Sequence, residues 1–345
     1  MNTVKATTSI HMLTMFMGTW LVLGIFVDGY AHNHRVPETF FTPWHAILYS
    51  GFLASALWIV GLIYVNKRRH GGTWQEAIPI GYGLGLIGVA VFLFGGIADM
   101  SWHLIFGIEQ ALDALLSPSH LLLMLGTLLI ISSPFRYGWA LSPDQPGWRH
   151  FFPILLSAAL TVGVVSFFLM YVWTFRYNLA APDVIDWYRS RTDPFFGIRV
   201  LEDLEMRGLT YILLNTLLFM FPVFLLLKRW QVPFGSFAFL FSFISVLMGV
   251  LDGFQQYLAI PVSLVGGLAA DLIYVKMRLR GCTTRGYRML AIVVPVALWG
   301  SYFLSMALSG GIGWVPELWT GSIVQASLLS LALSILAISP ERGRQ

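Results

Sequence analysis

The sequence predicts an all-α, polytopic transmembrane bundle of about ten helices, because its composition and its long apolar runs both fit that class. Hydrophobic residues make up 57% of the chain and charged residues only 11%, whereas soluble domains carry about 25% charged residues. A helix of about 20 apolar residues crosses the hydrocarbon core, and these runs are too long and too uniformly apolar for barrel strands. Ten runs approach that length: 8–28, 43–65, 78–100, 118–134, 152–174, 208–227, 235–256, 259–275, 288–309 and 320–338.

The first four runs form two helical hairpins that repeat one sequence pattern. Each outgoing helix ends in G-x3-D-x3-H, and each returning helix begins with Thr or Ser, then P-x-H-x5-G. Asp99 follows Asp28 by 71 residues and His120 follows His45 by 75, so the repeat covers whole hairpins. The first copy contains Gly24, Asp28, His32, Thr42, His45 and Gly51, and the second contains Gly95, Asp99, His103, Ser117, His120 and Gly126.

The spacing predicts that each hairpin gathers one carboxylate and two imidazoles. Residues four apart on a helix share one face, and Thr or Ser followed by Pro is typical of a helix start. The second His of each copy then lies in the first turn of the returning helix, beside the end of the previous one. Carboxylate and imidazole together favour a transition metal. The candidate ligands are Asp28, His32, His45, Asp99, His103 and His120.

The alternative is a hydrogen-bonded polar vestibule without metal. The single Cys282 excludes a thiolate cluster, so a metal would have N and O ligands only. Helix packing decides between one shared dinuclear site and two mononuclear sites, and the sequence leaves both open. Additional ligands or supporting groups could come from neighbouring residues, which are His34, Glu38, Glu109 and Asp113.

The chain divides, in this interpretation, into the hairpin pair at 1–138 and a remaining bundle of helices at 139–345. The longest outer connection, 176–207, mixes aromatic and charged residues and is typical of an interfacial amphipathic helix or a lid. Asp271 lies inside the eighth run, where we expect it to hold helices together by hydrogen bonds. A weaker echo of the hairpin pattern appears at Asp252, Gln256 and Ser263.

Lysine and arginine predict the orientation in the membrane. With the N-terminus inside, fifteen of the 21 Lys and Arg residues fall on inner segments and six on outer ones, as the positive-inside rule requires. We therefore expect a plasma (inner) membrane protein with both termini cytoplasmic and both Asp/His motifs near the outer face. The basic pI of about 9.2 follows from this topology and gives no support to nucleic-acid binding.

The second hairpin resembles a known copper protein. Residues 99–103 read D-x-x-W-H and residues 117–120 read S-P-x-H, a pattern similar to that of the copper-binding membrane subunit of particulate methane and ammonia monooxygenase. The resemblance covers 20 to 30 residues per hairpin and implies copper ligation by the same six Asp and His side chains. The strings D-x-x-W-H-x-x-F-G-I-E and S-P-x-H-L-L-L also resemble a family of bacterial multi-pass membrane proteins.

Three functions follow as hypotheses. The first is a monooxygenase-like membrane oxidoreductase, in which copper, or else iron, acts on a small apolar or lipid-like substrate. The second is copper or zinc handling or transport at the outer face. The third is a zinc-dependent membrane hydrolase with Glu109 as its base. An accessory role within a homo- or hetero-oligomer also fits the sequence.

Cysteine labelling in intact cells tests the predicted topology. A cysteine placed at Asn33 should react with a membrane-impermeant maleimide, because the positive-inside rule puts that position outside. Native Cys282, on the basic inner loop, should react only after the membrane is permeabilised. Labelling of Cys282 from outside would show that the orientation is the opposite of the predicted one.

Overall fold

The all-helical prediction is confirmed. The computed structural model describes residues 4–34, 42–107, 111–192 and 197–338, and every regular element in these ranges is a helix. Within them, nine spans are long and apolar enough to cross a membrane: α1 (Thr8–Asn33), α2 (Pro43–His70), α4 (Gly83–Phe106), α6 (Pro118–Ile131) continued by α7 (Ser133–Leu141), α8 (Trp148–Phe168), α11 (Gly197–Arg229), α13 (Ala259–Leu279), α14 (Thr284–Ser309) and α15 (Pro316–Ala337). The shorter elements are α3 (Trp74–Ala77), α5 (Ala111–Leu116), the 3-10 helix Met170–Val172, α9 (Thr174–Tyr177), α10 (Pro182–Arg191) and α12 (Ser236–Val250).

The seventh predicted span is shorter than expected. The run 235–256 forms α12, which has 15 residues, and the chain then turns until α13 begins. Gly253 and Phe254 have φ values of 62° and 60°, which an α-helix of L-residues does not accommodate. The run is apolar enough for a transmembrane helix, but its backbone leaves the helical conformation before the helix is long enough to cross the membrane.

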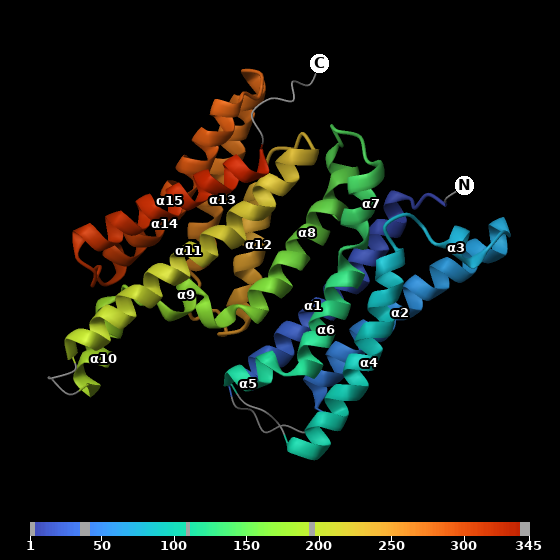
Figure 1. The fold of residues 1–345 in the computed structure, drawn as a ribbon, viewed down its shortest axis with the longest axis horizontal. Coiled ribbons are helices and arrows are strands. Elements are labelled where there is room, and N and C mark those ends of the chain that lie inside the picture. The colour runs from blue at the N-terminus through green and yellow to red at the C-terminus, as the bar shows by residue number, and fades with distance from the viewer. Residues whose placement is uncertain (1–3, 35–41, 108–110, 193–196, 339–345) are drawn as a thin grey trace. The chain divides into compact units, whose positions relative to one another are not determined.

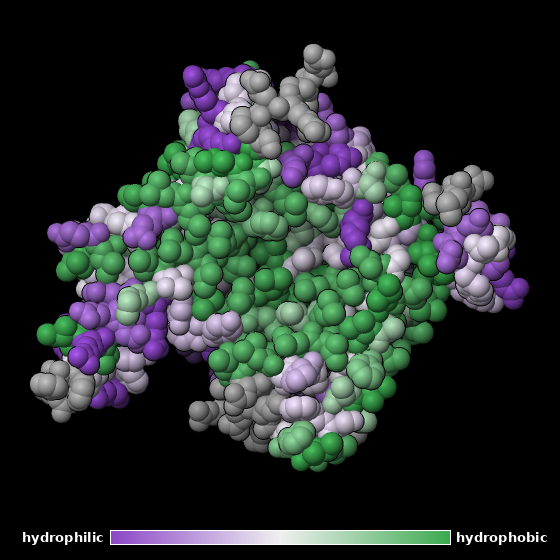
Figure 2. Space-filling view, viewed as in Figure 1, coloured by the Kyte–Doolittle hydropathy of each residue, from purple (hydrophilic) through white to green (hydrophobic). Residues whose placement is uncertain are grey.

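The chain separates into two compact units. Unit 1 contains residues 1–168 with 250–254, and unit 2 contains 169–249 with 255–345. Unit 1 thus holds the predicted hairpin pair 1–138 and also α8, which packs against α1, α6 and α7 (Figure 1). In Figure 2 hydrophobic residues dominate the visible helix surfaces, and hydrophilic residues gather at helix ends and loops. That distribution is expected of helices whose flanks face lipid.

Glycines bring the two helices of the first hairpin into backbone contact. A Cβ atom added at Gly24 of α1 would lie 2.5 Å from the Cα of Leu48, and one at Gly51 of α2 would lie 2.7 Å from the Cα of Leu21. Small residues at such positions allow close helix packing where no hydrophobic effect drives association. Asp28 and His32, one and two turns beyond Gly24, are thereby brought beside the start of α2.

The second hairpin repeats the same contacts. A Cβ atom at Gly126 of α6 would lie 2.7 Å from the backbone nitrogen of Phe92, and one at Gly95 of α4 would lie 3.1 Å from that of Leu123. The hairpins also contact each other reciprocally, because α1 packs against α6 and α2 packs against α4. At the second of these contacts the rings of Phe52 and Phe92 stack with centroids 4.2 Å apart.

Asp271 has the structural role expected of it. It is buried in α13, and its Oδ1 and Oδ2 accept hydrogen bonds from the backbone N–H groups of Phe237 and Ala238, at 3.3 and 2.9 Å. These N–H groups belong to the first turn of α12, where an α-helix leaves its donors unpaired. The carboxylate therefore caps α12 from a neighbouring helix.

The glycine contacts predict a sharp difference between two substitutions. Gly126→Leu should lower the stability of the purified protein by about 1–3 kcal/mol, because the side chain has no space against Phe92. Gly61→Leu on α2 is the matched control, since a Cβ atom there meets nothing within 4 Å. Thermal unfolding in detergent compares the two. Equal melting temperatures would show that the close approach at Gly126 is not required.

Candidate metal centre

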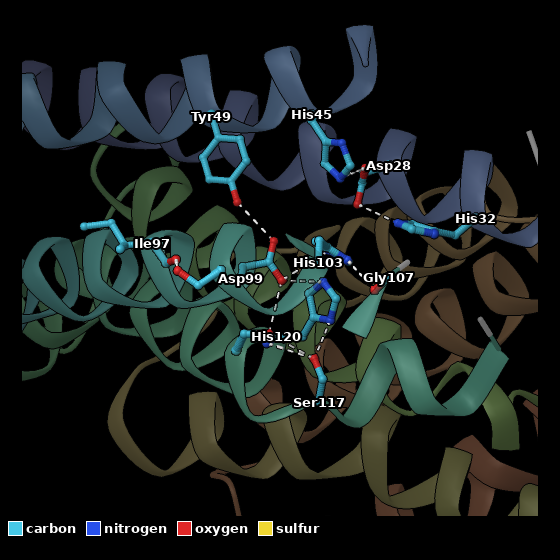
Figure 3. Close-up of polar contacts among 12 residues, drawn as sticks. Asp28, His32, His45, Tyr49, Ile97, Asp99, His103, Gly107, Ser117 and His120 are labelled. Atoms are coloured by element: carbon cyan, nitrogen blue, oxygen red, sulfur yellow. Dashed lines mark hydrogen bonds and ion pairs between the residues drawn. The ribbon is translucent and has the colours of Figure 1, made fainter. Parts of the chain in front are cut away.

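The first hairpin brings its three predicted ligands together at one end. Asp28 and His32 lie one turn apart near the end of α1, and His45 lies in the first turn of α2. Asp28 Oδ2 is 3.6 Å from His32 Nε2, and Asp28 Oδ1 is 3.3 Å from His45 Nε2. Figure 3 shows the carboxylate between the two imidazoles. We call this group the first triad.

The second hairpin builds the same group from α4 and α6. Asp99 Oδ1 is 3.6 Å from His103 Nε2 and 3.2 Å from His120 Nε2. In this second triad, as in the first, both imidazoles present the Nε2 atom to the carboxylate. Within each triad the donor atoms all lie within 4.8 Å of one another, and in the described part of the chain only these two groups of three have that property.

The other ring nitrogen of each returning-helix histidine contacts a hydroxyl. His45 Nδ1 is 2.9 Å from Thr42 Oγ1, and His120 Nδ1 is 2.7 Å from Ser117 Oγ. A hydroxyl that accepts the Nδ1 proton fixes the tautomer whose Nε2 carries a lone pair, which is the usual support of a metal-ligating histidine. Thr42 and Ser117, which the sequence places at helix starts, both occupy the N-cap position. Only Ser117 also accepts from the helix backbone, and Thr42 makes no such bond.

His103 is oriented by a backbone carbonyl. Its Nδ1 lies 3.4 Å from the carbonyl oxygen of Gly107, the residue that ends α4 with a φ of 82°. Its Nε2 is buried and has no hydrogen-bond partner among the described residues. Buried imidazole nitrogens are normally satisfied, so an Nε2 aimed at Asp99 at 3.6 Å is an arrangement that a bound cation would complete.

Tyr49 connects the two triads. It lies one turn after His45 on α2, with ring centroids 6.5 Å apart, and its hydroxyl donates to Asp99 Oδ2 at 3.2 Å (Figure 3). Ser119 Oγ donates to Asp99 Oδ1 at 3.1 Å. Asp99 is therefore held by two hydroxyls as well as facing two histidines. The sequence prediction missed both residues, although the spacing of Tyr49 from His45 was a signal.

The two triads are largely buried but not sealed. The side chain of Asp99 is 3% exposed, whereas those of His32 and His120 are 21% and 18% exposed. Each triad therefore has one histidine at its accessible edge. A small ion or molecule would approach past these two imidazoles.

The four additional candidates lie away from the triads or outside the described residues. His34 is exposed beyond α1, where its Nδ1 contacts the carbonyl oxygen of Tyr30 at 2.8 Å and its ring stacks on Tyr30. It belongs to neither triad. Glu38 and Glu109 lie outside the described residues, and so does the side chain of Asp113, whose backbone is part of α5.

No protein-family model, curated protein or solved structure matches this chain. The resemblance to the copper-binding membrane subunit of methane and ammonia monooxygenases stays a prediction. The fold and the site together define a polytopic helical membrane protein with two Asp/His/His groups suited to metal.

Proposed function

We propose that unit 1 binds two transition-metal ions, one in each triad, and that the chain is a membrane metalloprotein of oxidative type. The observation that carries this is the doubled geometry: one carboxylate and two Nε2 atoms converge in each hairpin, while a Thr or Ser hydroxyl holds the opposite nitrogen of the returning histidine. A merely hydrogen-bonded vestibule has no need of this shared orientation.

Copper is the metal we favour, with zinc and iron as alternatives. Imidazole and carboxylate accept all three, and thiolate is missing from both groups. The preference for copper comes from the resemblance of D-x-x-W-H and S-P-x-H to the copper-binding subunit. Three protein donors would leave a position open on a bound metal, which is typical of a catalytic site rather than a closed structural one.

A redox-active ion held there would supply one-electron chemistry, and the chain's own residues would set its surroundings. Asp99 is held by Tyr49 and Ser119, so its carboxylate has little freedom to rotate. The hydroxyl of Tyr49 also places an exchangeable proton next to Asp99 Oδ2. The exposed edges at His32 and His120 leave an approach for a small apolar or lipid-like substrate arriving from the membrane.

Transport across the membrane is the weaker alternative. Further along the helices from the triads, the stacked rings of Phe52 and Phe92 fill the space between the hairpins. A second polar cluster does lie at the other end of the same helices, where Tyr82 OH contacts His11 Nδ1 and Thr14 Oγ1 at 2.9 and 3.0 Å. The apolar layer between the two polar clusters makes the triads fit binding better than passage.

The proposal predicts metal in purified protein. Protein prepared without chelator should contain about two equivalents of metal, one per triad, and affinity should fall as the pH is lowered, because histidine must be neutral to bind. His45→Ala should remove one equivalent and His120→Ala the other. His150→Ala, at an exposed position distant in sequence, is the control. Elemental analysis with copper and zinc titration measures all four proteins.

Two results would count against it. Less than about a tenth of an equivalent of any transition metal, with no uptake from added copper or zinc, would leave only the hydrogen-bonded vestibule. Loss of all metal from either single variant would instead show one shared site.

Tyr49 should matter more for the second triad than for the first. Partners of a metal-bound carboxylate typically change affinity by about 10–100-fold when removed, so Tyr49→Phe should weaken binding at Asp99 by about tenfold. The second triad is isolated by measuring in the His45→Ala background, and the first triad by using His120→Ala. Tyr64→Phe, on the same helix and exposed, is the control. Equal effects on both triads would mean that Tyr49 acts only through packing.

A further inference from the structure

Unit 2 contains a cavity that the proposed metal function does not use. It has a volume of about 490 Å³ and lies between the α9–α10 segment, the start of α13 and the end of α14. Cavities of roughly 300–1,000 Å³ with a few convergent polar groups are typical of small-molecule sites. Every residue that lines it belongs to unit 2.

One side of the cavity is a fixed polar network. Asn178, which has a φ of 45°, accepts a hydrogen bond from the hydroxyl of Tyr302 at 3.2 Å and donates to Gln256 Oε1 at 2.8 Å. The hydrogen bond from Asn178 to Oε1 holds the side-chain amide of Gln256 in place. Its NH2 group has no hydrogen-bond partner among the described residues, and Gln256 is one of the residues that line the cavity.

Arg176 supplies an uncommitted positive charge at the same place. The residue is half-buried and lines the cavity, and its guanidinium makes no hydrogen bond or ion pair within the described ranges, although it lies 5.8 Å from the ring centre of Tyr177. Two other arginines of the outer segment are paired, Arg189 with Asp186 and Arg207 with Asp203. A half-buried guanidinium without a partner favours an anionic ligand, because desolvated charges require pairing.

The rest of the lining is apolar. Phe175, Val262 and Met306 are buried beside the cavity, and the ring of Phe175 is backed by Trp299 at 5.8 Å. Asp183 also lines the cavity but is exposed, so Arg176 is the only half-buried charge among the described lining residues. One guanidinium matches a single negative charge better than a phosphate dianion.

We propose that this cavity binds an amphipathic carboxylate, with the carboxylate on Arg176 and Gln256 and the hydrocarbon chain against Val262 and Met306. A guanidinium and an amide NH2 offer donors to the two oxygens of one carboxylate. The apolar walls take a medium-length chain such as that of a fatty acid. The site does not depend on the metal function of unit 1.

Binding of radiolabelled decanoate to the full chain in nanodiscs tests the proposal, with empty nanodiscs as background. Decanoate should bind saturably. Arg176→Gln should weaken it about ten- to a hundredfold, the usual loss for one charge-assisted hydrogen-bonded pair. Arg199→Gln, which removes the same charge at an exposed position, should leave the affinity unchanged. Met306→Trp, which fills the apolar end, should also weaken binding.

Four results would overturn the proposal. They are decanoate binding no greater than in empty nanodiscs, equal affinity of the wild-type and Arg176→Gln proteins, equal affinity for decanol, and competition by acetate as strong as by unlabelled decanoate. The first result would show that decanoate only partitions into lipid. The second and third would show that the ligand's carboxylate does not contribute to binding, and the fourth would show that its hydrocarbon chain does not. Metal content of the Arg176→Gln protein, measured in parallel, should match that of the wild type.

Discussion

The close approach of two helix backbones within each hairpin is the constraint on which the candidate site depends. Gly24 and Gly51 in the first hairpin, and Gly95 and Gly126 in the second, remove the side chains that would hold the helices apart. Only then does the last turn of one helix lie beside the first turn of the next. Side chains as short as aspartate and histidine meet across that gap because the backbones already touch. In lipid, where apolar burial does not drive helices together, such packing and the polar contacts at the hairpin end must do so instead.

The two triads have the same arrangement of one aspartate and two histidines but differ in the residues around them. Both place a hydroxyl on the Nδ1 side of the returning histidine, through Thr42 or Ser117. The aspartate of the second triad accepts hydrogen bonds from the hydroxyls of Tyr49 and Ser119. The residue equivalent to Ser119 in the first hairpin is a tryptophan, which has no hydroxyl to donate. A carboxylate that already accepts two such hydrogen bonds donates less charge to an ion, so Tyr49 and Ser119 would tune the affinity of an ion bound in the second triad.

Local rules of sequence predicted most of the fold and the identity of the triads. Hydropathy located the nine long apolar helices of the described residues, and the i,i+4 spacing of Asp28 and His32 placed them on one face. What the sequence left open comes from contacts between distant segments. Tyr49 reaches Asp99 only because α2 packs on α4, and Asp271 caps α12 only because α13 passes its first turn. The seventh span ended early through backbone conformation at Gly253, which hydropathy does not report.

The position of the triads along the helices limits what they can do. Polar groups gather at both ends of the hairpins, at Asp99 and its neighbours and at Tyr82 with His11, while Phe52 and Phe92 stack between. An ion crossing this layer would lose its ligands before reaching new ones, at a cost of several kcal/mol for each unpaired charge. An ion that stays at one end would keep its protein ligands, and small molecules could still reach it past His32 and His120. Under the proposed function, the same apolar layer would place a bound metal in a low-dielectric environment, and a low dielectric would strengthen its attraction to both aspartates.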